Sequence, residues 1–202
     1  MVKRFKIFEF VFLIPFIFSC SSYYGKKDDL GRLRINEKHW TLKNISNEEV
    51  KRVLDTEVLY KMKFSFNNQN NSFSNSKEDI ITQEKDQVYL RFFKTGHVLY
   101  SIPYLSNVTN GKIIGSKEEW LNLDFGKQGF YTMGSNEFEI EFFQGQNVSL
   151  FGSMDRYYYQ ALIEGDTLHL IRKSPFKENH YIHDIYIKQE MPEELKNQKA
   201  DW

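Results

Sequence analysis

The sequence contains one cysteine, four prolines and eleven glycines in 202 residues, and its charges cancel. A single cysteine excludes an intramolecular disulfide framework, a multi-cysteine zinc site and a Cys-x-x-Cys redox pair. Because 27 Lys and Arg face 27 Asp and Glu, the balance argues against a broad basic face and against an acidic disordered tail. We therefore expect no nucleic-acid partner.

Aromatic residues are abundant, with 18 Phe, 12 Tyr and 3 Trp making up 16% of the chain. A chain of this length and apolar content is sufficient for one folded domain with its own core. The composition excludes low-complexity and collagen-like architectures.

The first nineteen residues form a targeting segment. Three basic residues within the first six positions precede an apolar run over residues 10–18, and a serine follows directly before the only cysteine. This order is typical of a secretory signal. The run is too short for a membrane-spanning helix, which needs about 20 residues. We predict a lipoprotein signal peptide over residues 1–19.

Residues Ile17–Cys20 resemble the lipobox of bacterial lipoproteins, in which the cysteine receives a lipid. The resemblance implies that Cys20 is the lipidation site and that several acyl chains anchor the protein firmly in a membrane. The alternative is a buried free cysteine in an unlipidated leader. We expect a lipid-anchored protein of a bacterial cell envelope, on the periplasmic face or the outer surface of the outer membrane. Residues 20–37 are expected to be the lipidated cysteine and a polar tether.

The main domain is predicted over residues 38–190, with a polar tail over 191–202. A capping-box pattern at residues 46–49 predicts one short helix near 47–54. The Asn- and Ser-rich segment 67–86 has no periodicity and predicts a long loop.

Alternating polar and apolar residues predict the strands of this domain. Strand patterns separated by turn residues occupy residues 56–66, 88–93, 98–102, 112–114, 129–133, 137–142, 157–164, 167–172 and 181–188. About 8–10 short strands with tight turns predict an all-β antiparallel meander. We expect it to close into a barrel, with a β-sandwich as the alternative.

Three segments carry a resemblance to a family: Tyr89–Val98, Gly129–Phe143 and Ala161–Leu170. Their rhythm of strand, glycine turn and strand is similar to that of small bacterial lipoproteins with a lipocalin-like β-meander. The resemblance covers about 100 residues. Most members of such groups have no assigned activity, so the resemblance implies a fold and no reaction.

No catalytic constellation stands out. Ser74 and Lys77 match a Ser-x-x-Lys pattern and Lys94–Gly96 a Lys-Thr-Gly pattern, but the second is predicted to be a hairpin turn. Glu137, Glu139 and Glu141 share one strand face, which is typical of the solvated side of an amphipathic strand rather than of a catalytic carboxylate pair. We expect a protein that is not an enzyme.

The five histidines are scattered, without HExxH or His-x-His spacing. His180 and His183 lie three residues apart, so on a regular strand they point to opposite faces. We expect neither a metal site nor a cofactor.

Aromatic side chains are the remaining candidates for function. Tyr157 and Tyr159 face the same way, and Phe92 and Phe142 each have an aromatic neighbour on the opposite face. These four residues either line a pocket or fill the core. The sequence therefore predicts a non-catalytic binding module for a small apolar or amphipathic ligand. The alternative is a structural lipoprotein whose filled barrel docks another envelope protein.

Overall fold

The structure is a computed structural model. It describes residues 24–27, 33–43, 54–69, 71–73, 79–83, 88–101, 108–109, 112–113, 126–133, 137–146, 153–175, 177–200 and 202. The chain divides into two compact units, Met1–His39 and Trp40–Trp202. The predicted signal peptide, Cys20 and most of the helix expected near 47–54 lie outside the described residues.

The first unit contains a short hairpin. Strands β1 (Tyr24–Lys27) and β2 (Leu33–Ile35) pair antiparallel, and a 3-10 turn, η1, spans Glu37–His39. The predicted tether over 20–37 thus contains regular structure. Two short strands without a third are at best marginally stable in water, so this hairpin is a minor element of the fold.

Within the described residues, the second unit contains the other strands and one short helix. They are β3 (Val58–Asn68), β4 (Asp79–Gln83), β5 (Tyr89–Phe92), β6 (His97–Ser101), β7 (Val108–Thr109), β8 (Lys112–Ile113), β9 (Gly126–Met133), β10 (Glu137–Gln146), β11 (Ser153–Glu164), β12 (Thr167–Lys173), β13 (Tyr181–Glu190) and α5 (Glu193–Lys196). Strands β7 and β8 form a separate hairpin.

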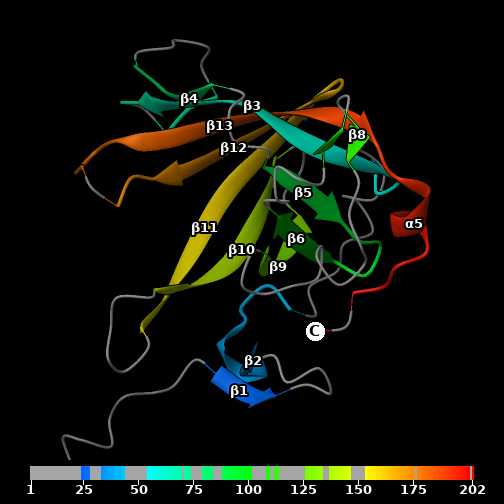
Figure 1. Ribbon diagram of the computed structural model, residues 1–202. Coiled ribbons are helices and arrows are strands. Elements are labelled where there is room, and N and C mark those ends of the chain that lie inside the picture. Colours follow the sequence, from blue (N-terminus) through cyan, green and yellow to red (C-terminus); the bar gives the residue numbers. More distant parts are fainter. Residues whose placement is uncertain are drawn as a thin grey trace, which may run out of the picture. The chain divides into compact units, whose positions relative to one another are not determined.

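Eight of the nine remaining strands close into an antiparallel barrel (Figure 1). The barrel strands pair in the order in which they occur along the chain, β13-β12-β11-β10-β9-β6-β5-β3, and β13 pairs with β3 to complete the circle. Strand β5 pairs with the first half of β3, and β4 pairs with the second half of β3 on the same side. The predicted all-β meander and barrel are confirmed, and the β-sandwich alternative is set aside because a closed ring has no free sheet edge.

Side chains alternate between the lumen and the outer wall, as strand geometry requires. Phe138, Ile140 and Phe142 belong to the main core cluster inside the barrel, whereas Glu137 and Glu139 between them are exposed. Tight turns join the hairpins: Lys94–Gly96 connects β5 to β6 as predicted. Gly165, which connects β11 to β12, has a φ of +60°, a value that glycine adopts without steric cost.

Two segments differ from the sequence-based expectation. The loop predicted over 67–86 is wrong in part, because β3 runs on to Asn68 and Asp79–Gln83 form β4. A register shift in β3 opposite Ile185 and Tyr186 also breaks the predicted alternation. As a result Met62 packs in the lumen, but Phe66 packs outside against His183, with ring centroids 4.6 Å apart.

The chain after β13 is held against the outer wall. Met191 and Leu195 pack on Leu59 and Tyr89 in a small cluster. Arg91, which is 4% exposed, donates from Nη1 to the side-chain carbonyl of Gln198 at 2.5 Å and from Nη2 to the main-chain oxygen of Leu195. Because Met191 and Leu195 cover it, Leu59 is fully buried although it lies on the outer face. No described helix is long and apolar enough to cross a membrane.

Candidate binding site at one end of the barrel lumen

The two ends of the barrel differ in how the strands are connected. At the hairpin end, defined by the connections β5–β6, β9–β10 and β11–β12, each strand follows the previous one after two to four residues. At the loop end, defined by the connections β6–β9, β10–β11 and β12–β13, β6 ends at Ser101 and β9 begins only at Gly126. Long connections at one end leave that end of a small barrel free to carry a site.

The hairpin end of the lumen is filled with aromatic rings. Phe92 packs edge-to-face on Tyr60, Tyr131 and Phe138, with ring centroids 5.3–6.1 Å apart. The Tyr131 hydroxyl donates to the main-chain oxygen of Phe93 at 2.7 Å. All four rings are at most 3% exposed. This half of the lumen is a packed core with its polar atoms largely satisfied.

The loop end of the lumen carries two cations. Lys127 precedes Gly129 and Tyr131 in the inward phase of β9, and Arg172 follows Leu168 and Leu170 in the inward phase of β12. Both side chains are half-buried. Inward-facing positions of a barrel wall are normally apolar, so two basic residues there need a specific reason.

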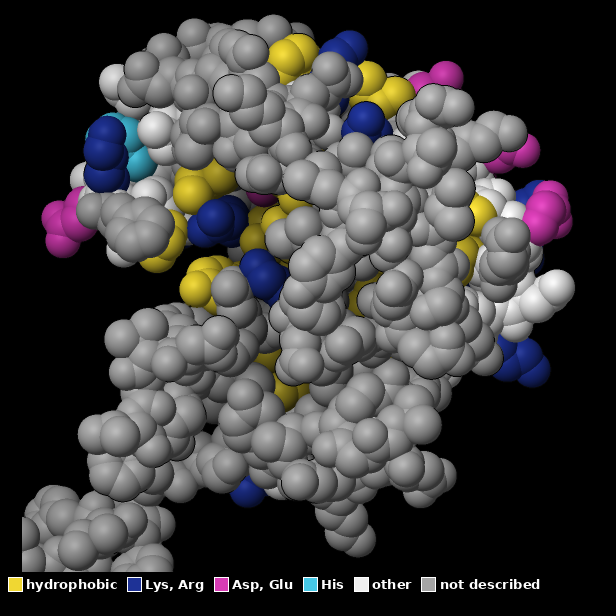
Figure 2. Space-filling view, viewed as in Figure 1, with side chains coloured by type: hydrophobic (Ala, Val, Ile, Leu, Met, Phe, Trp, Pro, Cys, Tyr) yellow, Lys and Arg dark blue, Asp and Glu magenta, His cyan; other side chains and the backbone are white. Residues whose placement is uncertain are grey.

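Tyrosine rings surround these cations. The Lys127 Nζ lies 4.5 Å from the centroid of the Tyr100 ring. The guanidinium carbon of Arg172 lies 5.7 Å and 5.8 Å from the ring centroids of Tyr157 and Tyr159. Cation–π contacts of this kind favour each charge without neutralising it. Figure 2 shows one face of the molecule, on which Lys and Arg side chains lie directly against hydrophobic ones.

One buried carboxylate shares this end of the lumen. Asp184 is 6% exposed and accepts a hydrogen bond of 2.5 Å from the Ser65 hydroxyl. Burial raises the pKa of Asp184, against the opposing effects of Ser65, Arg172 and Lys127. Tyr186, two residues along β13, has a buried hydroxyl without a hydrogen-bond partner in the described structure.

The electrostatics of the loop end favour an added negative charge. Burial and the positive charge of Arg172 lower the pKa of Lys127 to about 8, against the opposing effect of Asp184. Neither cation forms an ion pair within the described part of the chain. The Nε of Arg172 is buried and has no hydrogen-bond partner among the described residues. Among the described residues, two cations at this end face one carboxylate, so their positive charge exceeds the negative charge that described side chains supply.

The structure places all four aromatic residues singled out from the sequence on the inner face. Phe142 and Tyr159 pack edge-to-face at 5.6 Å near the loop end, and the half-buried Tyr157 packs against the same cluster. Phe92 belongs to the packed hairpin end. Gly129 makes room for Phe142, since a Cβ at this position would lie 2.6 Å from the Phe142 ring.

Sequence reasoning missed Lys127 and Arg172. The sequence did contain a signal, because each basic residue lies on the inward face of a strand whose other inward residues are apolar or glycine. It did not show that the two basic residues come close together. They lie on β9 and β12, which are not adjacent in the sheet, and only barrel closure brings both to one lumen.

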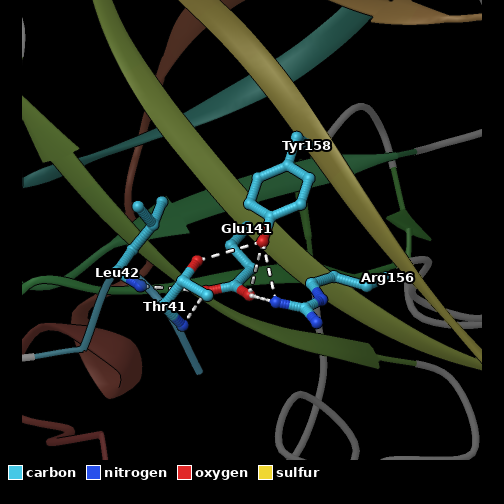
Figure 3. Close-up of polar contacts among 5 residues, drawn as sticks. All are labelled: Thr41, Leu42, Glu141, Arg156 and Tyr158. Atoms are coloured by element: carbon cyan, nitrogen blue, oxygen red, sulfur yellow. Dashed lines mark hydrogen bonds and ion pairs between the residues drawn. The ribbon is translucent and has the colours of Figure 1, made fainter. Parts of the chain in front are cut away.

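Glu141 corrects the expectation that three glutamates form a solvated face. Glu137 and Glu139 are exposed, but the Glu141 side chain is fully buried. Its Oε2 accepts hydrogen bonds from the backbone N–H groups of Thr41 and Leu42, at 2.9 and 3.1 Å (Figure 3). Because the carboxylate is saturated by a segment far away in the chain, Glu141 anchors that segment to the outer wall.

Arg156 and Tyr158 complete this cluster. The Arg156 Nη1 lies 3.4 Å from Glu141 Oε1 and donates to the Tyr158 hydroxyl at 2.8 Å. Next to the cluster, Trp40 packs edge-to-face on Phe143 with centroids 4.6 Å apart. Phe143, on the nominally outer face of β10, is therefore covered by the protein's own chain, whereas Tyr158 is 47% exposed.

A histidine pair lies on the outer wall. His169 Nδ1 and His183 Nε2 are 3.0 Å apart, and Glu164 lies 3.6 Å from His169 Nε2. Burial, with His169 beside it, lowers the pKa of His183 to about 4. His180, which we paired with His183 in the sequence, instead bonds to the main-chain oxygen of Glu178. Among the described residues, no three His, Cys, Asp or Glu side chains are placed to hold a metal ion.

Ser74 and Lys77 lie outside the described residues. A comparison of this chain with protein-family models, with curated proteins and with solved structures finds no match. The fold and the lumen must therefore carry the functional argument by themselves.

Proposed function

We propose that this protein is an exported, lipid-anchored envelope protein whose barrel is a non-catalytic binding module for a small amphipathic ligand. The observation that carries the proposal is the asymmetry of the lumen. Its hairpin end is packed with aromatic rings, whereas its loop end combines tyrosines with two half-buried cations that have no ion-pair partner in the described structure. An amphipathic ligand would place its apolar part against the tyrosines of the loop end and its polar part near the cations.

The alternative function is a structural lipoprotein that docks another envelope protein. The packed hairpin end favours it, because Phe92, Tyr131 and Phe138 leave this half filled with protein side chains. The two functions make opposite predictions for the loop end. A binding module takes up a small molecule there, and a docking protein does not.

A neutral fluorescent probe, N-phenyl-naphthylamine, tests the binding module. The full chain is placed in lipid nanodiscs and titrated, with empty nanodiscs as the blank. We compare Tyr157→Glu, which puts a charge at the loop end of the lumen, with Gln160→Glu, which puts the same charge on the exposed outer face of β11. Thermal melting of both variants checks that they remain folded.

Saturable binding to the wild type and to Gln160→Glu, weakened about tenfold or more by Tyr157→Glu, is the expected result. Fluorescence no greater than that of empty nanodiscs would overturn the binding module. Chemical cross-linking in the envelope to one defined protein would then favour the docking function.

The anchor is tested separately, because it depends on sequence alone. Palmitate labelling in a bacterial host is expected to mark the wild type and not Cys20→Ser. Equal labelling of both would contradict lipidation at Cys20 and would not bear on the binding module.

A further inference from the structure

At the loop end of the lumen, the described side chains carry more positive than negative charge. Lys127 and Arg172 repel each other, and the only acidic side chain facing them from β13 is Asp184. Asp184 is itself engaged by the Ser65 hydroxyl at 2.5 Å. A packed core normally avoids such charges, since burying an unpaired cation costs free energy.

The contacts of the two cations leave their charges available. Lys127 stands over the Tyr100 ring, and Arg172 over Tyr157 and Tyr159. A ring face interacts with a cation but accepts no directed hydrogen bond from it comparable with that of an anion. The buried Nε of Arg172 has no acceptor in the described structure. An anionic oxygen between these side chains would supply one.

We propose that Lys127 and Arg172 hold the anionic group of the ligand, so that the ligand class is an anionic amphiphile with a carboxylate, sulfonate or phosphate on an apolar body. The proposal rests on the binding module argued above. The tyrosines and Phe142 would contact the apolar body next to the charge, and the packed hairpin end limits how deeply that body enters.

Two probes that share one aromatic skeleton isolate the charge. Anilinonaphthalene sulfonate differs from N-phenyl-naphthylamine mainly by its sulfonate group, and both are titrated against the full chain in nanodiscs. We compare Lys127→Met and Arg172→Met with Lys173→Met, which removes an exposed lysine next to Arg172. Inorganic phosphate is added as a competitor, to separate an amphiphile site from a site for free anions.

The expected result is that the wild type and Lys173→Met bind the sulfonate probe about tenfold or more tightly than the neutral probe. Each lumen variant removes most of that preference, measured as the ratio of its affinities for the two probes. Neutral binding with an unchanged preference in both lumen variants would overturn the anion site while the binding module stands. If neither probe binds, the binding module fails as well. Complete displacement by millimolar phosphate would overturn the amphiphile class.

The pH dependence gives a second, independent test with a charge-preserving variant. The sulfonate stays ionised throughout, so affinity follows the protonation of the protein. Because the pKa of Lys127 is about 8, the charged form dominates at pH 7 and is lost by pH 9. Among the described residues, Arg172 and Asp184 act on the charge of Lys127, and the Tyr100 ring contacts it. Tyr157, Tyr159 and Tyr186 are the titratable groups around Arg172 and Asp184.

Sulfonate-probe affinity of the wild type is expected to fall severalfold between pH 7 and pH 9, whereas Lys127→Arg keeps the affinity nearly constant. A wild-type affinity that is flat over this range, or an equal fall in Lys127→Arg, would contradict the role of Lys127. Because Lys127→Arg retains the charge, it also provides the folded reference if Lys127→Met does not fold.

Discussion

Charged side chains on the outer wall of the barrel and the two cations in its lumen differ in the partners that the chain supplies. Outside, Glu141 accepts hydrogen bonds from two backbone N–H groups, and Arg91 donates to Gln198 and to the Leu195 carbonyl. Inside, Lys127 and Arg172 have ring faces and no ion-pair partner in the described structure. The outer charges have hydrogen-bond partners within the chain, whereas the two inner cations have no ion-pair partner among the described residues.

This difference distinguishes charged side chains that stabilise the fold from charged side chains that are available to a ligand. A buried charge with several partners stabilises the elements that supply them, and its loss leaves those partners unsatisfied. A half-buried charge without a partner costs free energy in the absence of a ligand. Removing outer charges should therefore destabilise the protein, whereas removing inner charges should not.

The largest effect is expected at Glu141. Replacing it with Ala removes the acceptor for the Thr41 and Leu42 N–H groups and leaves Arg156 without its buried partner. We expect a loss of about 3–5 kcal/mol in the free energy of unfolding, measured by urea denaturation. Glu139→Ala, on the exposed part of the same strand face, is expected to stay within about 0.5 kcal/mol. Equal effects of the two substitutions would contradict a structural role of the buried Glu141 carboxylate.

The histidine pair on the outer wall is expected to make stability depend on pH. The pKa of His183 in the folded protein is about 4, below the ordinary value of 6.5, so the unfolded chain binds the proton more readily. The contribution of neutral His183 to the free energy of unfolding is fully present above pH 6.5 and is lost as the pH falls toward 4.

Between pH 7 and pH 4.5, the wild type should therefore lose about 2–3 kcal/mol more than His183→Gln, measured by urea denaturation at each pH. Phe66, Phe73 and His169 surround the His183 ring, and Glu164 faces His169. His180→Gln is the control, because its ring bonds only at an exposed turn among the described contacts. Parallel pH profiles for the wild type and His183→Gln would contradict the assignment.

A smaller loss is expected at Arg91. Substitution by Met keeps much of the apolar stem but removes the Arg91 donor from both Gln198 oxygens and from the Leu195 oxygen, which still accepts from the Gln198 N–H. We expect about 2 kcal/mol of destabilisation, with faster hydrogen exchange confined to residues 191–200. Lys94→Met, at the neighbouring exposed turn, is the control. Unchanged exchange in the tail of the Arg91 variant would show that other contacts hold it.

The smallest effect, and the one of opposite sign, is expected at Lys127. Met at this position removes a cation whose pKa is lowered by burial and by Arg172. The ligand-free protein should be unchanged or more stable by up to about 1 kcal/mol at pH 7, in thermal melts of the nanodisc-bound chain. A loss comparable with that of Glu141→Ala would place Lys127 among the structural charges and weaken the contrast between wall and lumen.

Much of the barrel was predictable from local signals. The alternation of Phe138, Ile140 and Phe142 with glutamates identified the inner face of one strand, and Gly165 marked the turn that follows another. The aromatic candidates were also correctly expected to face inward or fill the core. What failed was local reasoning about exposure, as at Glu141, because exposure depends on which distant segment covers a residue.

The sequence by itself determined strand phase and turns, since side-chain direction along a strand depends only on neighbouring residues. Only the tertiary structure decided which residues meet. Pairing of β13 with β3 closed the barrel, a register shift turned Phe66 outward, and closure brought Lys127 of β9 into one lumen with Arg172 of β12. The physical reason is that burial and electrostatics are sums over all neighbours in space, most of which lie far away along the chain.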